Sequence, residues 1–415
     1  MTNWRSSKVL GAAVAFMALG LTAACGGGGA SDARAESQGV TGSTVKIGTI
    51  SDRSGPTVAN QKPWLDGFSA VIDRANEDGG IAGRKIELIN EDDKYDSAAG
   101  LTAYKKLVAQ TPVVAIAGIS SGDVQTTIVP LVDKDKIPVV GGLTTTNAAL
   151  QPFKDYFFAT APNYGDQVDV MLGYGKKLVA KDNPKVVVID NGSDTGVEVA
   201  SLAKERSGNG YDVVEELVLK PTDTTADAVV QKLIAAKPDY AIFHGSSSGV
   251  NLVLKAQEKF GATIPVIGIS PSGTPSSYAG VSDATAALFS FVQGVTPSSV
   301  EEPGTADLVA AAKAAGVEEE AGDPAFVSGY VAGLVMVAAL EKAGKDLDRA
   351  SLKDALESLS SIDTQGLTGP LGFGDDKRAG LSVLRPLTWD PATKTYKAVG
   401  AFSDYESMLS HEYTK

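Results

Sequence analysis

The chain has 415 residues, enough for two or three domains. With 43% apolar and 21% charged residues, its composition is that of a folded protein with a sizeable core. Its 50 acidic residues outnumber 37 basic ones and no basic run occurs, which argues against a nucleic-acid partner. One cysteine and two histidines cannot form a Cys/His zinc site or a disulfide framework, so we expect no metal and no cofactor.

The N-terminus has the pattern of an export signal. Arg5 and Lys8 precede an unbroken apolar and small-residue segment over residues 9–24, which is too short to span a bilayer comfortably. It ends in Leu21-Thr22-Ala23-Ala24-Cys25, which resembles a bacterial lipoprotein box with Thr22 at a position where leucine is commoner. We expect a signal peptide at 1–24 and acylation of Cys25, so that the exported protein is lipid-anchored on the outer face of the bacterial cell membrane. The alternative is a plain secretory signal with a coincidental cysteine.

The segment 25–44 starts with four glycines and continues with polar residues, so it is predicted to be a flexible tether. From residue 45 onwards, short apolar runs alternate with longer segments of helical spacing. Strands are predicted at residues 45–50, 85–91, 113–118, 137–141, 185–190, 213–217, 240–244 and 264–269. Helices are predicted at 64–75, 97–110, 123–134, 168–179, 197–209, 225–236 and 250–260. This alternation predicts an α/β fold with two doubly wound, parallel-sheet lobes.

The segment 329–340 is continuously apolar and contains Gly329 and Gly333 at the spacing that lets helices approach closely. Ser328 and Glu341 cut it well short of a membrane span. We therefore predict a helix buried inside a lobe.

Enzyme signatures were tested and mostly fail. The first strand runs into Ser51-Asp52-Arg53-Ser54-Gly55-Pro56, which is not a glycine-rich dinucleotide loop, and no P-loop occurs. The acidic cluster at 91–96 lacks the spacing of a calcium loop and is more typical of a solvated strand end. Gly245-Ser246-Ser247-Ser248-Gly249 does fit G-x-S-x-G between a strand and a helix. A triad built on Ser247 would need His411, which lies in a polar tail, so we expect no enzyme and keep a serine hydrolase as the least favoured alternative.

A resemblance emerges from several segments taken in order. They are Ser54-Gly55-Pro56, residues 76–85, Glu91-Asp92-Asp93, Gly118-Ile119-Ser120-Ser121, Thr144-Thr145-Thr146-Asn147, Tyr156-Phe157-Phe158 and Gly369-Pro370-Leu371-Gly372-Phe373. The sequence resembles a type I periplasmic binding protein, and more narrowly the leucine/isoleucine/valine-binding branch, the substrate-binding subunits of ABC importers. The resemblance implies a first lobe at 45–163 plus 295–376, a second lobe at 164–294 plus 377–415, three hinge crossings and a small-molecule ligand between the lobes. It also implies an ABC permease and ATPase subunits as partners, with an exported ligand-sensing domain of the same fold as the alternative.

Physical reasoning indicates the same place for a ligand, because parallel sheets bind ligands beyond the carboxyl ends of their strands. Ser120 and Ser121 follow one strand, and Thr145 and Thr146 follow the next. Hydroxyls and N–H groups at helix starts could receive a carboxylate, although these residue types also favour ordinary capping. With the resemblance, we favour ligand contact.

The resemblance implies four further cleft residues, and all four depart from the amino-acid-binding pattern. Asn60 stands where the family has an aromatic residue, Thr195 where it has a tyrosine, and Ser246 or Ser247 where it has a second one. Of these two serines we favour Ser247, and Ser270 stands where the family has the acid that receives an α-amino group. The residues that would bind the carboxylate of an amino acid are thus retained, and those that would bind its ammonium group are lost. We expect a branched-chain amino acid, an amide, or an organic or aromatic acid as ligand.

Overall fold

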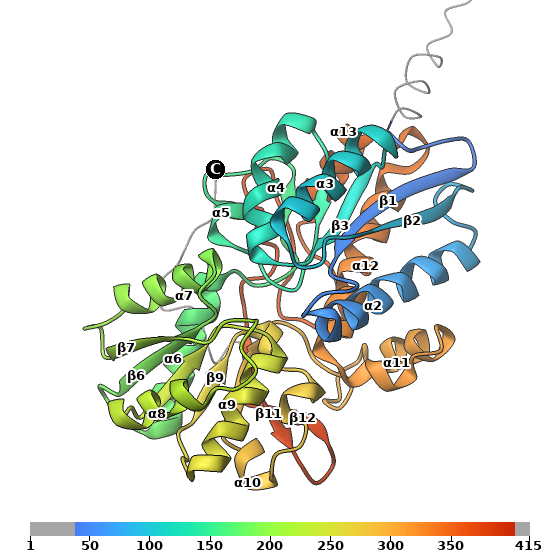
Figure 1. Ribbon diagram of the computed structural model, residues 1–415. Coiled ribbons are helices and arrows are strands. Elements are labelled where there is room, and N and C mark those ends of the chain that lie inside the picture. Colours follow the sequence, from blue (N-terminus) through green and yellow to red (C-terminus); the bar gives the residue numbers. More distant parts are fainter. Residues whose placement is uncertain (1–37, 403–415) are drawn as a thin grey trace, which may run out of the picture.

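The computed structural model describes residues 38–402, which form two α/β lobes (Figure 1). The first lobe contains a five-stranded parallel sheet in the order β2-β1-β3-β4-β5. Its strands are β1 (Thr44–Ser51), β2 (Lys85–Asp92), β3 (Ala115–Ile119), β4 (Val139–Val140) and β5 (Phe157–Phe158). The strand order reverses between β1 and β3, and such a point opens a crevice beyond the carboxyl ends of the two strands.

The second lobe contains a seven-stranded sheet in the order β12-β11-β10-β9-β8-β6-β7. The parallel strands are β6 (Lys185–Asp190), β7 (Asp212–Val218), β8 (Tyr240–Phe243), β9 (Val266–Gly268) and β10 (Phe289–Gln293). Two antiparallel strands, β11 (Arg385–Asp390) and β12 (Thr395–Ala398), extend one edge. The predicted fold class, two doubly wound parallel-sheet lobes, is confirmed, and the antiparallel edge is an addition to it.

Helices cover both faces of each sheet. In the first lobe they are α2 (Val58–Glu77), α3 (Ser97–Lys105), α4 (Gly122–Asp135), α5 (Asn147–Leu150), α11 (Thr305–Ala314), α12 (Pro324–Ala343) and α13 (Arg349–Glu357). In the second they are α6 (Tyr164–Val179), α7 (Asp194–Glu205), α8 (Asp227–Ala236), α9 (Ser247–Phe260) and α10 (Asp283–Ala286). The predicted helix 97–110 is interrupted, because α3 continues as a π-helical turn over Lys106–Gln110.

The closest helix pair is α2 with α12, far apart in sequence and packed together in the first lobe. A Cβ atom at Gly329 would lie 1.8 Å from the carbonyl oxygen of Trp64, and one at Gly67 would lie 2.0 Å from that of Phe326. Glycine is therefore required on both helices. Of the residues that the structure describes, only Pro324–Asp346 has the length and composition to cross a membrane, and it is mostly buried in protein. The predicted buried helix is confirmed.

The chain passes between the lobes in three connections, β5–α6, β10–α11 and α13–β11. The lobe limits inferred from the resemblance fall within these connections, and we keep them as a proposal. Packing against the first lobe begins before residue 45, because Val40 is buried and forms a bridge with Val45. The predicted signal peptide, Cys25 and His411 lie outside the described residues.

Candidate functional site

Two adjoining hollows lie between the lobes. The inner one has a volume of about 50 Å³ and the outer one about 370 Å³. The inner cavity is lined at the carboxyl ends of strands and the starts of helices in both lobes. From the first lobe come Thr57, Asn60, Gln61, Tyr95, Ser120, Ser121, Gly122, Leu143 and Thr144, and from the second Tyr164, Asn191, Thr195, His244, Gly245, Ser246, Ile269 and Pro271. This is where parallel α/β sheets bind ligands.

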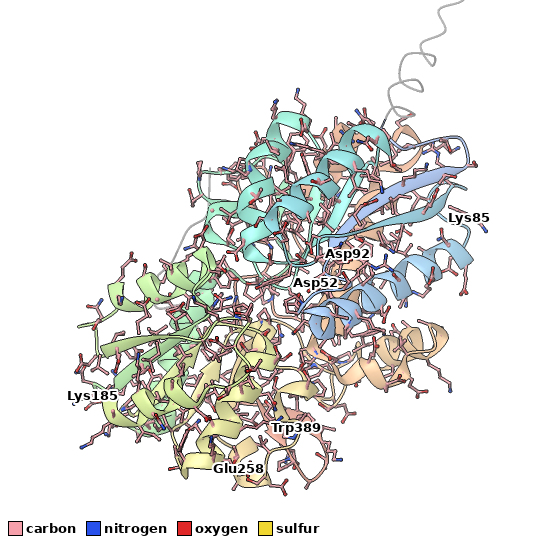
Figure 2. All side chains as sticks on the ribbon, in the orientation of Figure 1. Asp52, Lys85, Asp92, Lys185, Glu258 and Trp389 are labelled. Carbon is pink, nitrogen blue, oxygen red and sulfur yellow. The ribbon has the colours of Figure 1, made fainter. Side chains whose placement is uncertain are left out.

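Three aspartates hold the loops that shape the first-lobe wall. Carboxylate oxygens of Asp52, Asp92 and Asp93 lie within 4.8 Å of one another. Figure 2 shows Asp52 and Asp92 on the side of the first lobe that faces the second. Asp52 accepts hydrogen bonds from the N–H and hydroxyl of Thr57, each at 2.7 Å, and Asp93 accepts one from the Ser120 hydroxyl. These carboxylates therefore position residues of the cavity wall.

Five of the eight predicted ligand-binding residues line the hollows: Asn60, Ser120, Ser121 and Thr195 the inner cavity, and Ser247 the outer. Ser121 caps α4, with its Oγ accepting from the N–H of Val124 at 3.2 Å. The hydroxyl hydrogen of Ser121 is thus left to donate to a ligand. Ser120 differs, because its hydroxyl donates to Asp93 and presents only acceptor lone pairs to the cavity.

The other three predicted residues, Thr145, Thr146 and Ser270, are buried but do not line either hollow. The hydroxyl of Thr145 donates to the carbonyl of Ala161 at 2.9 Å, and that of Thr146 caps α5 by accepting from Ala149 N at 3.1 Å. Ser270 Oγ donates to Gln293 Oε1 at 2.9 Å. In this structure their hydroxyls form hydrogen bonds within the protein. Of the three threonines at 144–146, Thr144 is the one that lines the cavity.

Direct hydrogen bonds join the lobes across the cleft. Ser247 Oγ donates to Asn60 Oδ1 at 3.2 Å, and Asn60 Nδ2 donates to the carbonyl of Pro271 at 2.8 Å. In addition, the N–H of Thr195 donates to Asp123 Oδ1 at 3.3 Å. The structure is therefore a closed form, in which two predicted ligand contacts, Asn60 and Ser247, bond to each other.

The surroundings of Ser247 bear on the serine-hydrolase alternative. Its hydroxyl donates to Asn60 and accepts from Ser276 Oγ at 3.0 Å. Among residues 38–402, neither ring nitrogen of His244 has a hydrogen-bond partner, so this nearby imidazole is not placed to take a proton from Ser247. Within residues 38–402, no Ser–His pair is formed at the G-x-S-x-G segment.

The aromatic side chains of the inner cavity were not predicted from the sequence. His244 follows directly on β8, and Tyr164 begins α6, with their ring centroids 5.2 Å apart in an edge-to-face arrangement. Burial lowers the pKa of His244 to about 4, so the imidazole is neutral. The signal available in the sequence was a histidine at the end of a predicted strand, next to a serine-rich helix start.

The described lining of the inner cavity carries no charged side chain. Its described lining contains hydroxyl, amide and aromatic groups, and no Lys, Arg, Asp or Glu. Burial raises the pKa of Tyr95 to about 12 and that of Tyr164 well above its usual value, so both phenols stay protonated and can donate. An ammonium group would find no counter-charge on this wall, whereas a carboxylate or amide would find several donors.

Comparison with known proteins gives a consistent result. The sequence pattern of the periplasmic binding protein family matches residues 44–394. The Leu/Ile/Val-binding protein homolog 3 of Brucella melitensis is 25% identical over 322 residues, which covers 77% of this chain and 85% of that protein. A fatty acid ABC transporter substrate-binding protein from Thermomonospora curvata superposes with a TM-score of 0.79 at 23% identity, covering 91% of this chain and 97% of the other.

A branched-chain amino acid ABC transporter protein from Thermus thermophilus, solved with bound valine, also superposes with a TM-score of 0.79, at 18% identity over 89% of this chain and 97% of the other. These homologues are binding proteins, and their family is that of exported, extracytoplasmic proteins. The resemblance inferred from the sequence is thereby confirmed. The chain belongs to the type I periplasmic binding proteins, in the leucine/isoleucine/valine-binding branch.

Proposed function

We propose that this chain is the substrate-binding lipoprotein of an ABC importer. It captures a small ligand between its lobes outside the cytoplasm and delivers it to a permease driven by ATPase subunits. Cys25 provides the lipid anchor, and the tether after it lets the lobes reach the permease. The sequence motif at Cys25 and the family to which the chain belongs support this role.

The proposed ligand carries a carboxylate or amide and needs no ammonium group. One observation carries this proposal: the inner cavity is lined by neutral hydrogen-bonding groups and by no carboxylate. An ammonium buried there would be uncompensated, which is costly. Ser121, free to donate from the start of α4, is the residue we assign to the acidic or amide group. Apolar parts of the ligand would extend toward the outer hollow, where Leu219, Phe243 and Leu252 contribute to a wall that also includes Lys220 and Asp223.

Titration calorimetry with three probes of one carbon skeleton tests this proposal. The probes are leucine, its deaminated acid 4-methylpentanoate, and 4-methylpentanamide. We expect the acid or the amide to bind more tightly than leucine, because only leucine brings an ammonium into the cavity. Tight binding of leucine with no binding of the acid or the amide would contradict the ligand class. Permease and ATPase genes beside this gene would favour the importer over an exported sensor of the same fold.

A further inference from the structure

His244 is a buried polar side chain on the wall of the inner cavity that the proposed function leaves unused. It is 3% exposed, and neither Nδ1 nor Nε2 has a hydrogen-bond partner among the described residues. Buried polar atoms are paired in the great majority of cases, so an unpaired ring on a cavity wall indicates a partner that the chain itself does not supply. The small volume of the cavity, about 50 Å³, means that one group entering it meets both walls at once.

The groups around His244 leave it without a counter-ion. From α6 comes the phenol of Tyr164, edge-on to the imidazole. The neighbouring strand β6 ends in Asp190, one residue beyond the pair Ile189–Phe243. The segment after β9 and the start of α9 contribute Ile269 and Ser246 to the cavity wall, and neither side chain titrates. Burial raises the pKa of Asp190, whose Oδ1 accepts from Gly192 N at 2.7 Å. No cation faces the ring from these elements.

Across the cavity, the first lobe presents Tyr95, and behind Tyr164 lie Asp123 and Glu198. Burial raises the pKa of all three, to about 12 for Tyr95 and to about 7 for Glu198. The cavity therefore contains one side chain, His244, that can become a cation within it. Burial is the main cause that lowers its pKa, and an anion in contact would raise it.

We propose that His244 receives the acidic group of the ligand and takes up one proton from solvent when a carboxylate binds, forming an imidazolium–carboxylate pair opposite Ser121. This inference rests on the proposed function and adds to it a pH dependence and a chemical preference. No bond other than the N–H bond is made. Delivery of the ligand at a higher pH would release the same proton.

The direction of the pH dependence follows from linkage. In the closed form without ligand the pKa of His244 is about 4, and in the complex it is higher, so the complex holds more protons between these two values. Affinity for a carboxylate therefore rises as the pH falls, by up to about tenfold per pH unit for one proton. The rise ends where the carboxyl group of the probe is itself protonated, near about pH 4.5. An amide probe has no charge to offer, so its affinity should lack this contribution from His244.

Histidine NMR tests the proposal directly, because the chain has only two histidines. The soluble mature chain carrying His411→Gln has one imidazole, whose pKa is read with and without saturating acetate, 4-methylpentanoate or 4-methylpentanamide. We expect a low pKa in the free protein, a rise of at least about one unit with a carboxylate, and no rise with the amide. Calorimetry of 4-methylpentanoate in two buffers of different protonation enthalpy should show uptake of up to one proton.

Two variants distinguish proton uptake by His244 from proton uptake by other titratable groups. His244→Gln keeps a hydrogen-bonding side chain but cannot titrate, so in a protein that also carries Glu198→Gln its affinity for 4-methylpentanoate should be flat from about pH 5 to about pH 8. Glu198→Gln should retain the proton uptake, because Glu198 lies outside the cavity lining. If His244→Gln does not fold, the NMR and two-buffer measurements on the protein that retains His244 still test the proposal.

The outcomes distinguish this inference from the proposed function. If 4-methylpentanoate binds without moving the His244 pKa and without proton uptake, the inference is wrong and the ligand class stands. If leucine alone binds, the ligand class is wrong and the inference fails with it. If the amide raises the His244 pKa as much as the acid does, the imidazolium–carboxylate pair is contradicted.

Discussion

Glu198 on α7 accepts a hydrogen bond from the backbone N–H of Asn147 at the start of α5, with Asn147 N and Glu198 Oε1 2.9 Å apart. The bond joins the second lobe to the first. Burial raises the pKa of Glu198 to about 7, in spite of the opposing effect of this hydrogen bond. The carboxyl group is therefore held at a lobe contact where ionisation costs free energy.

This contact predicts pH-dependent closure. When the lobes separate, Glu198 becomes hydrated and its pKa falls toward the ordinary value of about 4.3. The closed form then holds more protons between about pH 4.3 and about pH 7, so closure weakens as the pH rises through this window, by up to about 1.4 kcal/mol per pH unit. Small-angle scattering of the ligand-free protein should show expansion on raising the pH. Glu198→Gln should remove that expansion, and an equal expansion in the variant would contradict the assignment.

The hydrogen bond between Asn60 and Ser247 predicts an energetic coupling across the cleft. Asn60→Ala and Ser247→Ala should each weaken the affinity for a bound ligand by about 0.5–1.5 kcal/mol, because each removes a bond made only in the closed form. The double variant should cost less than the sum of the two. Calorimetry over this double-mutant cycle measures the coupling.

Thr102→Ala is the control for that cycle, since Thr102 is exposed, lines neither hollow and donates to the carbonyl of Ala98 within its own helix, α3, at 2.9 Å. It should leave the affinity unchanged. The same Ser247→Ala protein also tests the hydrolase alternative: an ester-hydrolysing activity present in the wild type and lost in this variant would revive it.

Ser121 and Thr146 are both helix caps, but only Ser121 faces the cavity. Ser121→Ala should weaken binding of a carboxylate ligand by about 1.5–3 kcal/mol, the range for a hydrogen bond to a charged group. Thr146→Ala should lower the free energy of unfolding by about 1 kcal/mol and change the affinity little. Calorimetry and chemical denaturation on both variants check the difference. Equal losses of affinity would show that Thr146 contacts the ligand after all.

The lipid anchor is tested by Cys25→Ser. Without the thiol, acylation is impossible, so the protein should move from the membrane fraction to a soluble or uncleaved form. Cell fractionation with detection of the mature chain measures this. A variant that is still mature and membrane-bound would contradict the lipoprotein reading.

The strands that the sequence predicts well are those with long apolar runs. The segment 185–190 was predicted at the bounds of β6, because burial on both faces leaves an apolar run that ends in Asp190. The strand β5 has only two residues, Phe157 and Phe158, which is too short to produce a periodic signal. The antiparallel edge strands β11 and β12 alternate buried and exposed positions weakly and were missed.

Prediction of the site was limited because a sequence does not show which way each side chain points. Three consecutive threonines follow β4, and the pattern alone does not indicate which one faces the cavity; only Thr144 does. His244 was missed for a different reason. Its burial depends on Tyr164, which is 80 positions earlier in the chain and packs edge-on against it. A contact of that separation leaves no local pattern.

The glycine-mediated contact between α2 and α12 has a consequence for biosynthesis. The strands of the first sheet and α2 are complete by residue 158, yet α12 begins only at Pro324, after the parallel strands of the second lobe. A nascent chain that ends between these points would expose the apolar surface of α2 around Trp64 and Phe68, both buried in the finished protein. The first lobe therefore cannot finish folding as it emerges. Export in an unfolded state, with chaperones shielding this surface until the last quarter of the chain arrives, suits such an order of assembly.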